Sequence, residues 1–158
     1  MMKNLSQSLK WVRIAFVALA ATTMWQMPAA AGDYVVVVNE ANTFSADAEQ
    51  MRNQVRRYFL KESKNWPDGS NVVPFARKPG NASYDAMLVG ILGMNQSEFD
   101  AHWARKKQTT GDTRPRSVGS SNILLRLIKR DAGTIGVIEK ADAGKIPAGV
   151  KILFEFTS

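Results

Sequence analysis

The chain has no cysteine and only one histidine, His102. The lack of cysteine excludes disulfide bonds, thiolate catalysis and a cysteine-linked lipid anchor, and it argues against a structural zinc site. The sequence also has no Gly-x-Ser-x-Gly elbow, no Walker loop and no cluster of metal-ligating residues. A lone histidine lacks the nucleophile and the orienting group that a catalytic base needs. We therefore expect a protein that is not an enzyme and that uses no cofactor or metal.

The charge balance is only moderately basic. The 158 residues carry a formal net charge of +7, and residues 1–31 contain three of the 21 basic residues and none of the 14 acidic ones. A net charge of +4 therefore remains for residues 32–158, with the basic side chains scattered along the sequence. This balance fits an anionic ligand or an acidic partner, but it does not indicate nucleic-acid binding.

Residues 1–31 have the organisation of a secretory signal peptide. Three basic residues accompany an apolar run at 14–24, and three alanines at 29–31 end the segment. An uncleaved membrane anchor is the alternative, but the run is short for a membrane span, and no Arg-Arg pair marks the twin-arginine route. We expect cleavage after Ala31, a periplasmic or secreted protein without membrane attachment in its mature form, and a single domain over residues 32–158.

Strands and helices are predicted to alternate along this domain. The β-branched run at 34–38 predicts a strand that is buried on both faces, and three further strands are predicted at 71–76, 134–138 and 150–156. Pro74 lacks an N–H group, so the second strand is expected to lie at a sheet edge or to be interrupted there. The alternation predicts an α/β fold, a mixed sheet flanked by helices.

Apolar side chains repeat at helical spacing in the segments between these strands. Ser45 is the expected N-cap of the first helix. Its basic residues Arg52, Arg56 and Lys61 lie off the apolar stripe and are expected to face solvent. Asn95 and Glu98 have the spacing of a capping box at the start of another helix. Further helices are predicted over 84–92 and after residue 121. Large aromatic side chains supply core area, so we expect the tryptophans at 66 and 103 to pack in the interior.

The segment from Arg77 to Ser83 lies between a predicted strand and a predicted helix. The first N–H groups of a helix lack partners, and the helix dipole places partial positive charge there, so an anion can bind beside an arginine and small donors. The alternative is that Asn81 or Ser83 only caps the helix and that Arg77 is solvated. A second helix start, with Ser120 and Ser121, offers similar donors. Ligands of α/β sheets bind beyond strand ends, so both segments are candidates for an anion site.

Three motifs in register resemble those of the phosphate-binding proteins of ABC importers. Residues 58–61 through Trp66-Pro67-Asp68-Gly69 are similar to the family's phenylalanine, glycine-lysine and tryptophan-aspartate signature. Arg77 with residues 80–83 is similar to its arginine and Gly-Ser-Gly-Thr loop, and residues 133–137 are similar to its Gly-Ala-Ile-Gly-Tyr strand. The resemblance implies a fold like one lobe of a type 2 periplasmic binding protein, in a short, single-lobe version.

By this resemblance, Arg77 would clamp phosphate or a similar oxyanion. Asn81 and Ser83 would donate from their side chains, Ala82 would donate from its backbone N–H, and Gly80 would make the turn. Two departures affect this expectation: the loop has Asn-Ala-Ser where the family has Ser-Gly-Thr, and the chain is too short for two lobes. A one-sided site stays wet, and exposed charge pairs contribute only roughly 0 to 1 kcal/mol each, so binding is expected to be weak unless a homodimer or a partner covers the site.

The residues and the resemblance lead to two alternative hypotheses about function. The first is a periplasmic solute-binding protein for phosphate or a similar oxyanion, linked to uptake through an ABC permease. The alternative is a periplasmic protein-interaction or regulatory domain that keeps the lobe fold without a role in transport.

Overall fold

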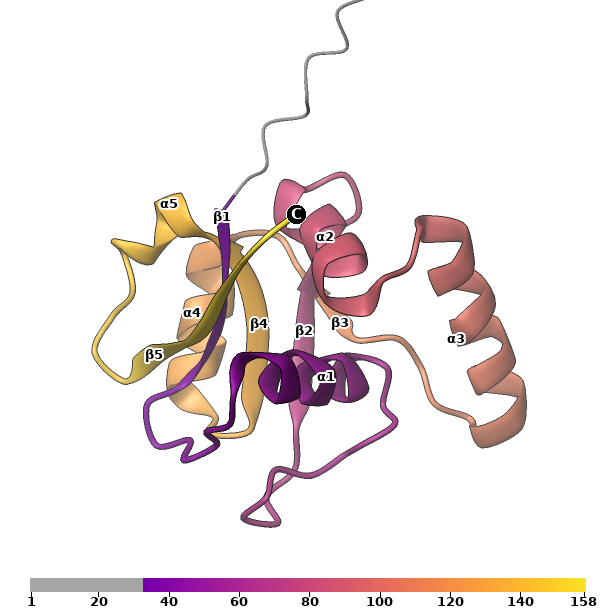
Figure 1. Cartoon of the computed structure of the whole chain (residues 1–158), viewed down its shortest axis with the longest axis horizontal. Coiled ribbons are helices and arrows are strands. Elements are labelled where there is room, and N and C mark those ends of the chain that lie inside the picture. Colours follow the sequence, from indigo (N-terminus) through magenta and orange to yellow (C-terminus); the bar gives the residue numbers. More distant parts are fainter. Residues whose placement is uncertain (1–32) are drawn as a thin grey trace, which may run out of the picture.

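A computed structural model describes residues 33–158, and the predicted signal peptide at 1–31 lies outside these residues (Figure 1). The described elements are, in chain order, β1 (Asp33–Asn39), α1 (Ala48–Phe59), β2 (Val73–Arg77), α2 (Ala82–Ala86), η1 (Met87–Leu92), α3 (Gln96–Thr110), β3 (Arg116–Val118), α4 (Ser121–Arg130), β4 (Thr134–Glu139), α5 (Lys140–Ala143) and β5 (Val150–Thr157).

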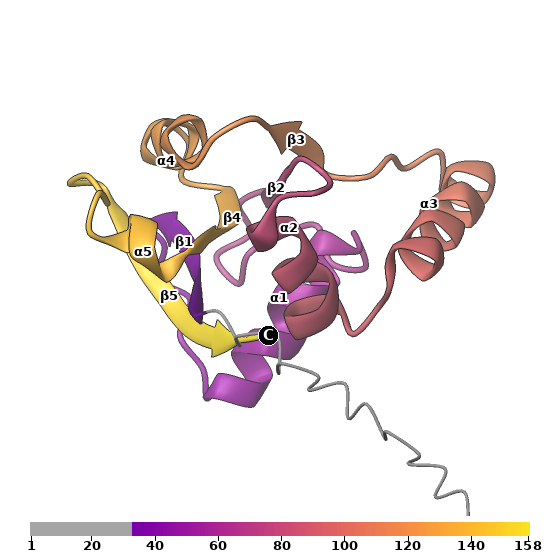
Figure 2. The same ribbon diagram turned by 90° about the horizontal axis from the view of Figure 1, so that it is seen from above.

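The strands form one five-stranded sheet in the order β3-β2-β4-β1-β5. Strand β2 is parallel to β3 and β4, whereas β1 is antiparallel to β4 and β5. Helices cover both faces of the sheet: α1 and the α2–η1 segment lie on one face and α4 lies on the other (Figures 1 and 2). This arrangement confirms the predicted α/β class with a mixed sheet.

Strand β1 is buried on both faces, as its β-branched run predicted. Val36 and Val38 belong to the hydrophobic cluster under α1 and η1, whereas Val35 and Val37 belong to the cluster under α4. Successive side chains of a strand point to opposite faces, so a central strand between two helical layers needs apolar residues at every position.

Strand β2 changes its partner at Pro74. Val73 and Pro74 pair with β4, and the ladder with β3 begins only at Phe75. Because β2 lies inside the sheet, an edge position is wrong, but the predicted interruption is confirmed on the β3 side. The proline therefore stands where no neighbouring β3 residue is paired with it.

Two glycines of the segment at 133–137 are required by close packing. A Cβ atom on Gly133 would lie 2.1 Å from the carbonyl oxygen of Asn71, and one on Gly136 would lie 2.6 Å from a methyl carbon of Leu124. Neither position leaves room for a side chain, which gives this motif a structural reason independent of any ligand.

The helix boundaries partly differ from those predicted. Helix α1 begins at Ala48 with Asp47 as its N-cap, whose side chain accepts the Gln50 N–H at 2.8 Å, so the prediction of Ser45 was wrong. The segment predicted at 84–92 begins as α2 and continues as the π-helix η1. The capping box of Asn95 and Glu98 at the start of α3 is confirmed.

Arg52 and Arg56 contact protein rather than solvent alone. Arg52 Nη1 donates to the carbonyl oxygen of Gly90 at 2.6 Å, and Arg56 Nε donates to that of Leu92 at 3.2 Å. The last carbonyls of a helical segment lack partners within it, and these guanidinium groups supply them. The predicted solvent-facing role is therefore wrong for both arginines, which join α1 to η1.

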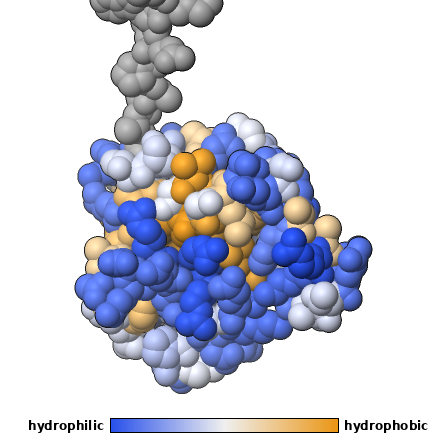
Figure 3. All heavy atoms as spheres, turned by 45° about the vertical axis from the view of Figure 1, so that its right-hand side comes forward, coloured by the Kyte–Doolittle hydropathy of each residue, from blue (hydrophilic) through white to orange (hydrophobic). Residues whose placement is uncertain are grey.

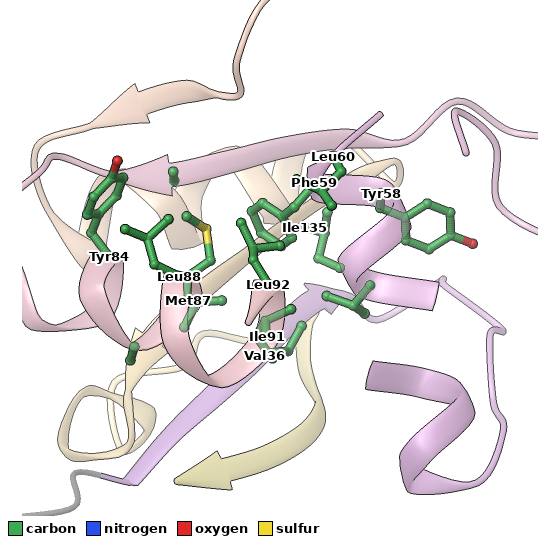
Figure 4. Packing of buried hydrophobic residues seen from close by; sticks show 14 of the residues in the cluster. Val36, Tyr58, Phe59, Leu60, Tyr84, Met87, Leu88, Ile91, Leu92 and Ile135 are labelled. Carbon is green, nitrogen blue, oxygen red and sulfur yellow. The ribbon is translucent and has the colours of Figure 1, made fainter. Parts of the chain in front are cut away.

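The larger hydrophobic cluster contains Trp66 and Trp103, both 3% exposed, which confirms their packing role. Tyr58 and Tyr84 lie at opposite ends of the group of side chains drawn in Figure 4. The face in Figure 3 is mostly hydrophilic with a small hydrophobic area. Within residues 33–158, no helix has the length and apolar character needed to cross a membrane.

Candidate anion-binding site

The candidate site residues follow the carboxyl ends of the parallel strands. Arg77 ends β2, Ser120 and Ser121 follow β3, and Asp142 lies in α5, directly after β4. Because these three strands are parallel, their carboxyl ends lie at one edge of the sheet, which Figure 2 shows from above. This is the edge at which α/β sheets bind ligands.

Hydrogen bonds join the two segments that the sequence singled out. Arg77 Nη1 donates to Ser121 Oγ at 2.5 Å, and Nη2 donates to the carbonyl oxygen of Gly119 at 3.1 Å. Ser121 Oγ in turn donates to Asp142 Oδ2 at 2.7 Å. The guanidinium of Arg77 is therefore positioned by the start of α4, and the prediction that it is merely solvated is wrong.

Asp142 is held as a carboxylate by this network. Hydrogen bonding from Ser121 is the main reason that the pKa of Asp142 lies below its ordinary value, followed by the hydrogen bond from Lys145 Nζ at 3.0 Å. The positive charge of Arg77 contributes in the same direction. A negative charge therefore lies near the arginine that would bind an anion.

The start of α2 combines capping with a turn. Gly80 adopts a φ of +83°, a conformation that glycine takes without steric cost. The Asn81 side chain accepts the N–H of Ser83 at 3.1 Å, and Ser120 Oγ accepts the N–H of Ile123 at 3.3 Å. Both residues are therefore N-caps, as the capping alternative for Asn81 predicted. Ala82 is the first residue of α2 and is exposed.

Two polar groups near this edge have no hydrogen-bond partner among the described residues: Arg77 Nε and Ser83 Oγ. Both atoms are buried, and Ser83 as a whole is 1% exposed. Buried polar groups in folded proteins are nearly always satisfied, so each unsatisfied one calls for an explanation. Both can donate a hydrogen bond, which is what an oxyanion accepts.

Among residues 33–158, no group of three or more His, Cys, Asp or Glu side chains could hold a metal ion. His102 packs edge-on against the Trp103 ring, with ring centroids 5.2 Å apart.

Sequence reasoning missed Asp142 and the Gly119 carbonyl. Helix α5 has only four residues, and β3 has only three, so neither produces a periodic pattern that could be recognised. Asp142 could have been found only by applying the rule for strand ends to β4 as well.

Comparison with known proteins shows likeness in structure alone. No protein-family profile and no curated protein sequence matches the chain. An ABC-type phosphate transport receptor from Vibrio cholerae has a similar fold (TM-score 0.56, 16% identity, 78% of this chain and 46% of that chain). PstS from Borrelia burgdorferi is also similar (TM-score 0.57, 16% identity, 78% of this chain and 47% of that chain). So is a phosphate ABC transporter substrate-binding protein with bound phosphate from Clostridium perfringens (TM-score 0.52, 18% identity, 78% of this chain and 45% of that chain).

The chain spans less than half the length of each of these receptors. At such low identity the likeness establishes the fold and not the activity. It confirms the expected fold, a mixed α/β sheet flanked by helices, which resembles about half of these receptors.

Proposed function

We propose that this protein binds phosphate or a similar oxyanion at the edge formed by Arg77, Ser83 and Ser121, as a periplasmic or secreted solute-binding protein linked to ABC-type phosphate uptake. The observation that carries the proposal is the pair of buried donors without partners, Arg77 Nε and Ser83 Oγ, at the carboxyl ends of the parallel strands. The named neighbours are phosphate receptors and binding proteins, which supports a binding role over a catalytic one.

The bound anion would be held by charge and by directed donors. Arg77 supplies a permanent positive charge and a fork of N–H groups that suits an oxyanion. Ser83 supplies a hydroxyl, and the helical segment that begins at Ala82 supplies the Ala82 N–H and the positive end of its dipole, because the next N–H groups are already bonded to Asn81. Arg77 would exchange its hydrogen bonds to Ser121 and Gly119 for hydrogen bonds to the anion, so the loss of the first two offsets part of the binding free energy.

Binding at this edge alone is expected to be weak. Arg77 is only partly buried, and the carboxylate of Asp142 lies within the same hydrogen-bonded network. Charge pairs that remain in contact with water contribute about 0 to 1 kcal/mol each. We therefore propose that a second copy of the chain or a partner protein completes the site. An ABC permease is the partner expected for a role in transport.

Calorimetric titration of the purified protein with phosphate and with sulfate tests this proposal. Arg77→Ala should abolish saturable binding, because it removes the charge and the fork together. Ser83→Ala should weaken binding by roughly five- to tenfold, the size expected for one hydrogen bond of about 1 kcal/mol. Arg126→Ala is the matched control, because it removes one exposed positive charge from α4 without touching the site.

Saturable binding that is lost in Arg77→Ala and kept in Arg126→Ala would support the proposal. Binding that both variants retain would place the anion elsewhere and overturn it. Absence of binding by either anion would also overturn it, and would favour the alternative of a periplasmic interaction domain that keeps only the fold.

A further inference from the structure

We propose that the opposite edge of the sheet carries a second ligand site, a cavity that takes a neutral, hydroxyl-rich ring compound of the size of a small saccharide. The cavity has a volume of about 470 Å³ and lies between Phe44, the outer face of α1 and the turn at Asn65 and Pro67. Volumes of about 300 to 1,000 Å³ are typical of small-molecule sites. The proposal is independent of the anion site.

The position of this cavity follows from Trp66. Its indole Nε1 donates to the carbonyl oxygen of Gly133 at 3.2 Å, and Gly133 directly precedes β4. Trp66 therefore lies at the amino end of β4, whereas Arg77 lies at the carboxyl end of the parallel neighbour β2. A ligand in the cavity would not contact the edge that carries Arg77.

An aromatic wall closes one side of the cavity. Phe44 and Tyr58 both line it, and both rings pack against Trp66, with centroid separations of 5.9 Å and 4.7 Å. Because Trp66 is 3% exposed and bonded to Gly133, it fixes the two rings in place. A preformed apolar wall suits the flat C–H face of a saturated ring.

Amide side chains make up most of the polar lining. Gln50, Asn53, Gln54 and Asn65 each offer a donor and an acceptor, which is also what a hydroxyl group offers. Arg57 is the one charged residue of the lining, and the lining contains no carboxylate. This balance of donors and acceptors matches a neutral polyhydroxylated ligand better than an anion, which needs donors only.

The hydroxyl of Tyr58 provides the second observation. Tyr58 is only 1% exposed, and its hydroxyl has no partner of regular hydrogen-bond geometry within the described part of the chain; the Gln54 side chain is the one group that interacts with it as a hydrogen-bond partner. Burial raises the pKa of Tyr58, and hydrogen bonding with the Gln54 side chain partly lowers it. Figure 4 shows the hydroxyl pointing away from the other labelled side chains. Tyr58 lines the cavity, and a ligand that displaced the Gln54 side chain could accept a hydrogen bond from this phenol.

Amide NMR of the ¹⁵N-labelled protein tests the proposal, because it detects weak binding residue by residue. The probes are glucose, galactose and N-acetylglucosamine, each added at millimolar concentration. We expect shifts of the side-chain amides of Gln50, Asn53, Gln54 and Asn65 and of the Trp66 indole. Tyr58→Phe keeps the ring and removes only the hydroxyl, and it should weaken the affinity by roughly five- to tenfold.

Two control variants separate this site from the rest of the molecule. Tyr84→Phe removes a buried phenol hydroxyl elsewhere and should leave the shifts unchanged, and Arg77→Ala should do the same. The proposal is overturned if none of the three sugars causes these shifts, if Tyr58→Phe binds as well as the wild type, or if benzoate, a flat anion, shifts the same amides while the sugars do not.

Discussion

Tyr58 and Tyr84 lie at opposite ends of one hydrophobic cluster, and the protein treats their hydroxyls differently (Figure 4). Burial raises the pKa of both phenols. The Tyr84 hydroxyl donates to Gln96 Oε1 at 2.9 Å, whereas the Tyr58 hydroxyl has no partner of regular geometry in the described part of the chain and interacts only with the Gln54 side chain. The Tyr84 hydroxyl is therefore firmly paired, and that of Tyr58 is not.

The same distinction applies within the anion end of the sheet. Asn81 and Ser120 use their side chains to cap helices, and Ser121 both accepts from Arg77 and donates to Asp142. Ser83, in contrast, keeps an unpaired hydroxyl. A buried donor without a partner needs an explanation, which a side chain that caps a helix does not.

The largest expected effect distinguishes two glycines at opposite ends of the parallel strands. Gly133→Ala should destabilise the protein by at least about 3 kcal/mol, because its Cβ would meet the Asn71 carbonyl oxygen at 2.1 Å, where backbone cannot easily yield. Gly80→Ala at the anion end should cost only about 1 kcal/mol, the strain of a positive φ in open space. Urea denaturation measures both, and equal losses would contradict this account of Gly133.

The next effect concerns the contact that joins the two ends. Arg52 lies on α1, which also carries Tyr58, and bonds to Gly90 in the segment that follows Tyr84. Arg52→Ala should cost about 1 to 2 kcal/mol, because a charge-assisted hydrogen bond is lost and a helix-terminal carbonyl is left without it. Arg57→Ala, an exposed change on the same helix, is the control and should change the free energy of unfolding little. A similar loss in both variants would mean that the removal of a positive charge from α1, and not the bond to Gly90, is responsible.

Removal of the hydroxyl should change the stability of the protein differently at Tyr84 and at Tyr58, and this difference should be smaller than the effects above. Tyr84→Phe should cost about 1 kcal/mol, because the Gln96 side chain loses its donor. Tyr58→Phe should cost nothing or stabilise slightly, because the hydroxyl that it removes has no partner of regular geometry. Thermal denaturation of both variants measures the difference. A clear loss of stability in Tyr58→Phe would show that its hydroxyl is already satisfied, and would remove the main support for the cavity as a ligand site.

Much of this fold could be predicted because its strongest signals are local. The run at 34–38 predicts a central strand, and Asn95 with Glu98 predicts a helix start. The partners of Arg52 and Arg56 could not be predicted, because they are backbone carbonyls more than 30 residues away. The π-helical turn at 87–92 depends on tertiary packing and leaves no pattern in the sequence.

The candidate site was only half predictable for a related reason. Arg77 and Ser121 were each recognisable from small residues at a helix start, but their hydrogen bond depends on the parallel pairing of β2 with the very short β3. The lack of a partner of regular geometry for the Ser83 and Tyr58 hydroxyls is likewise a property of the packed interior. Sequence alone identifies a donor, and only the structure shows whether the protein has already used it.

The smallest expected effect concerns acid stability at the anion end. The pKa of Asp142 lies below its ordinary value of 3.8, mainly through the Ser121 hydroxyl and then through Lys145. A carboxyl whose pKa is lowered by folding stabilises the protein fully above its unfolded pKa, and this contribution is lost as the pH falls through the lowered folded value. Asp142→Asn should therefore reduce stability at neutral pH by less than about 1 kcal/mol, because the pair with Lys145 is partly exposed.

The same substitution at the other end provides the comparison. The pKa of Asp68 is also lowered, first by the Ser70 hydroxyl and then by the Ser70 N–H, but Asp68 is exposed to solvent. The wild type is expected to have a lower urea midpoint near pH 3 than at neutral pH. Asp142→Asn should reduce this difference between the two midpoints more than Asp68→Asn does. If Asp142→Asn keeps the full acid dependence of the wild type, the bonds from Ser121 and Lys145 do not stabilise the carboxylate.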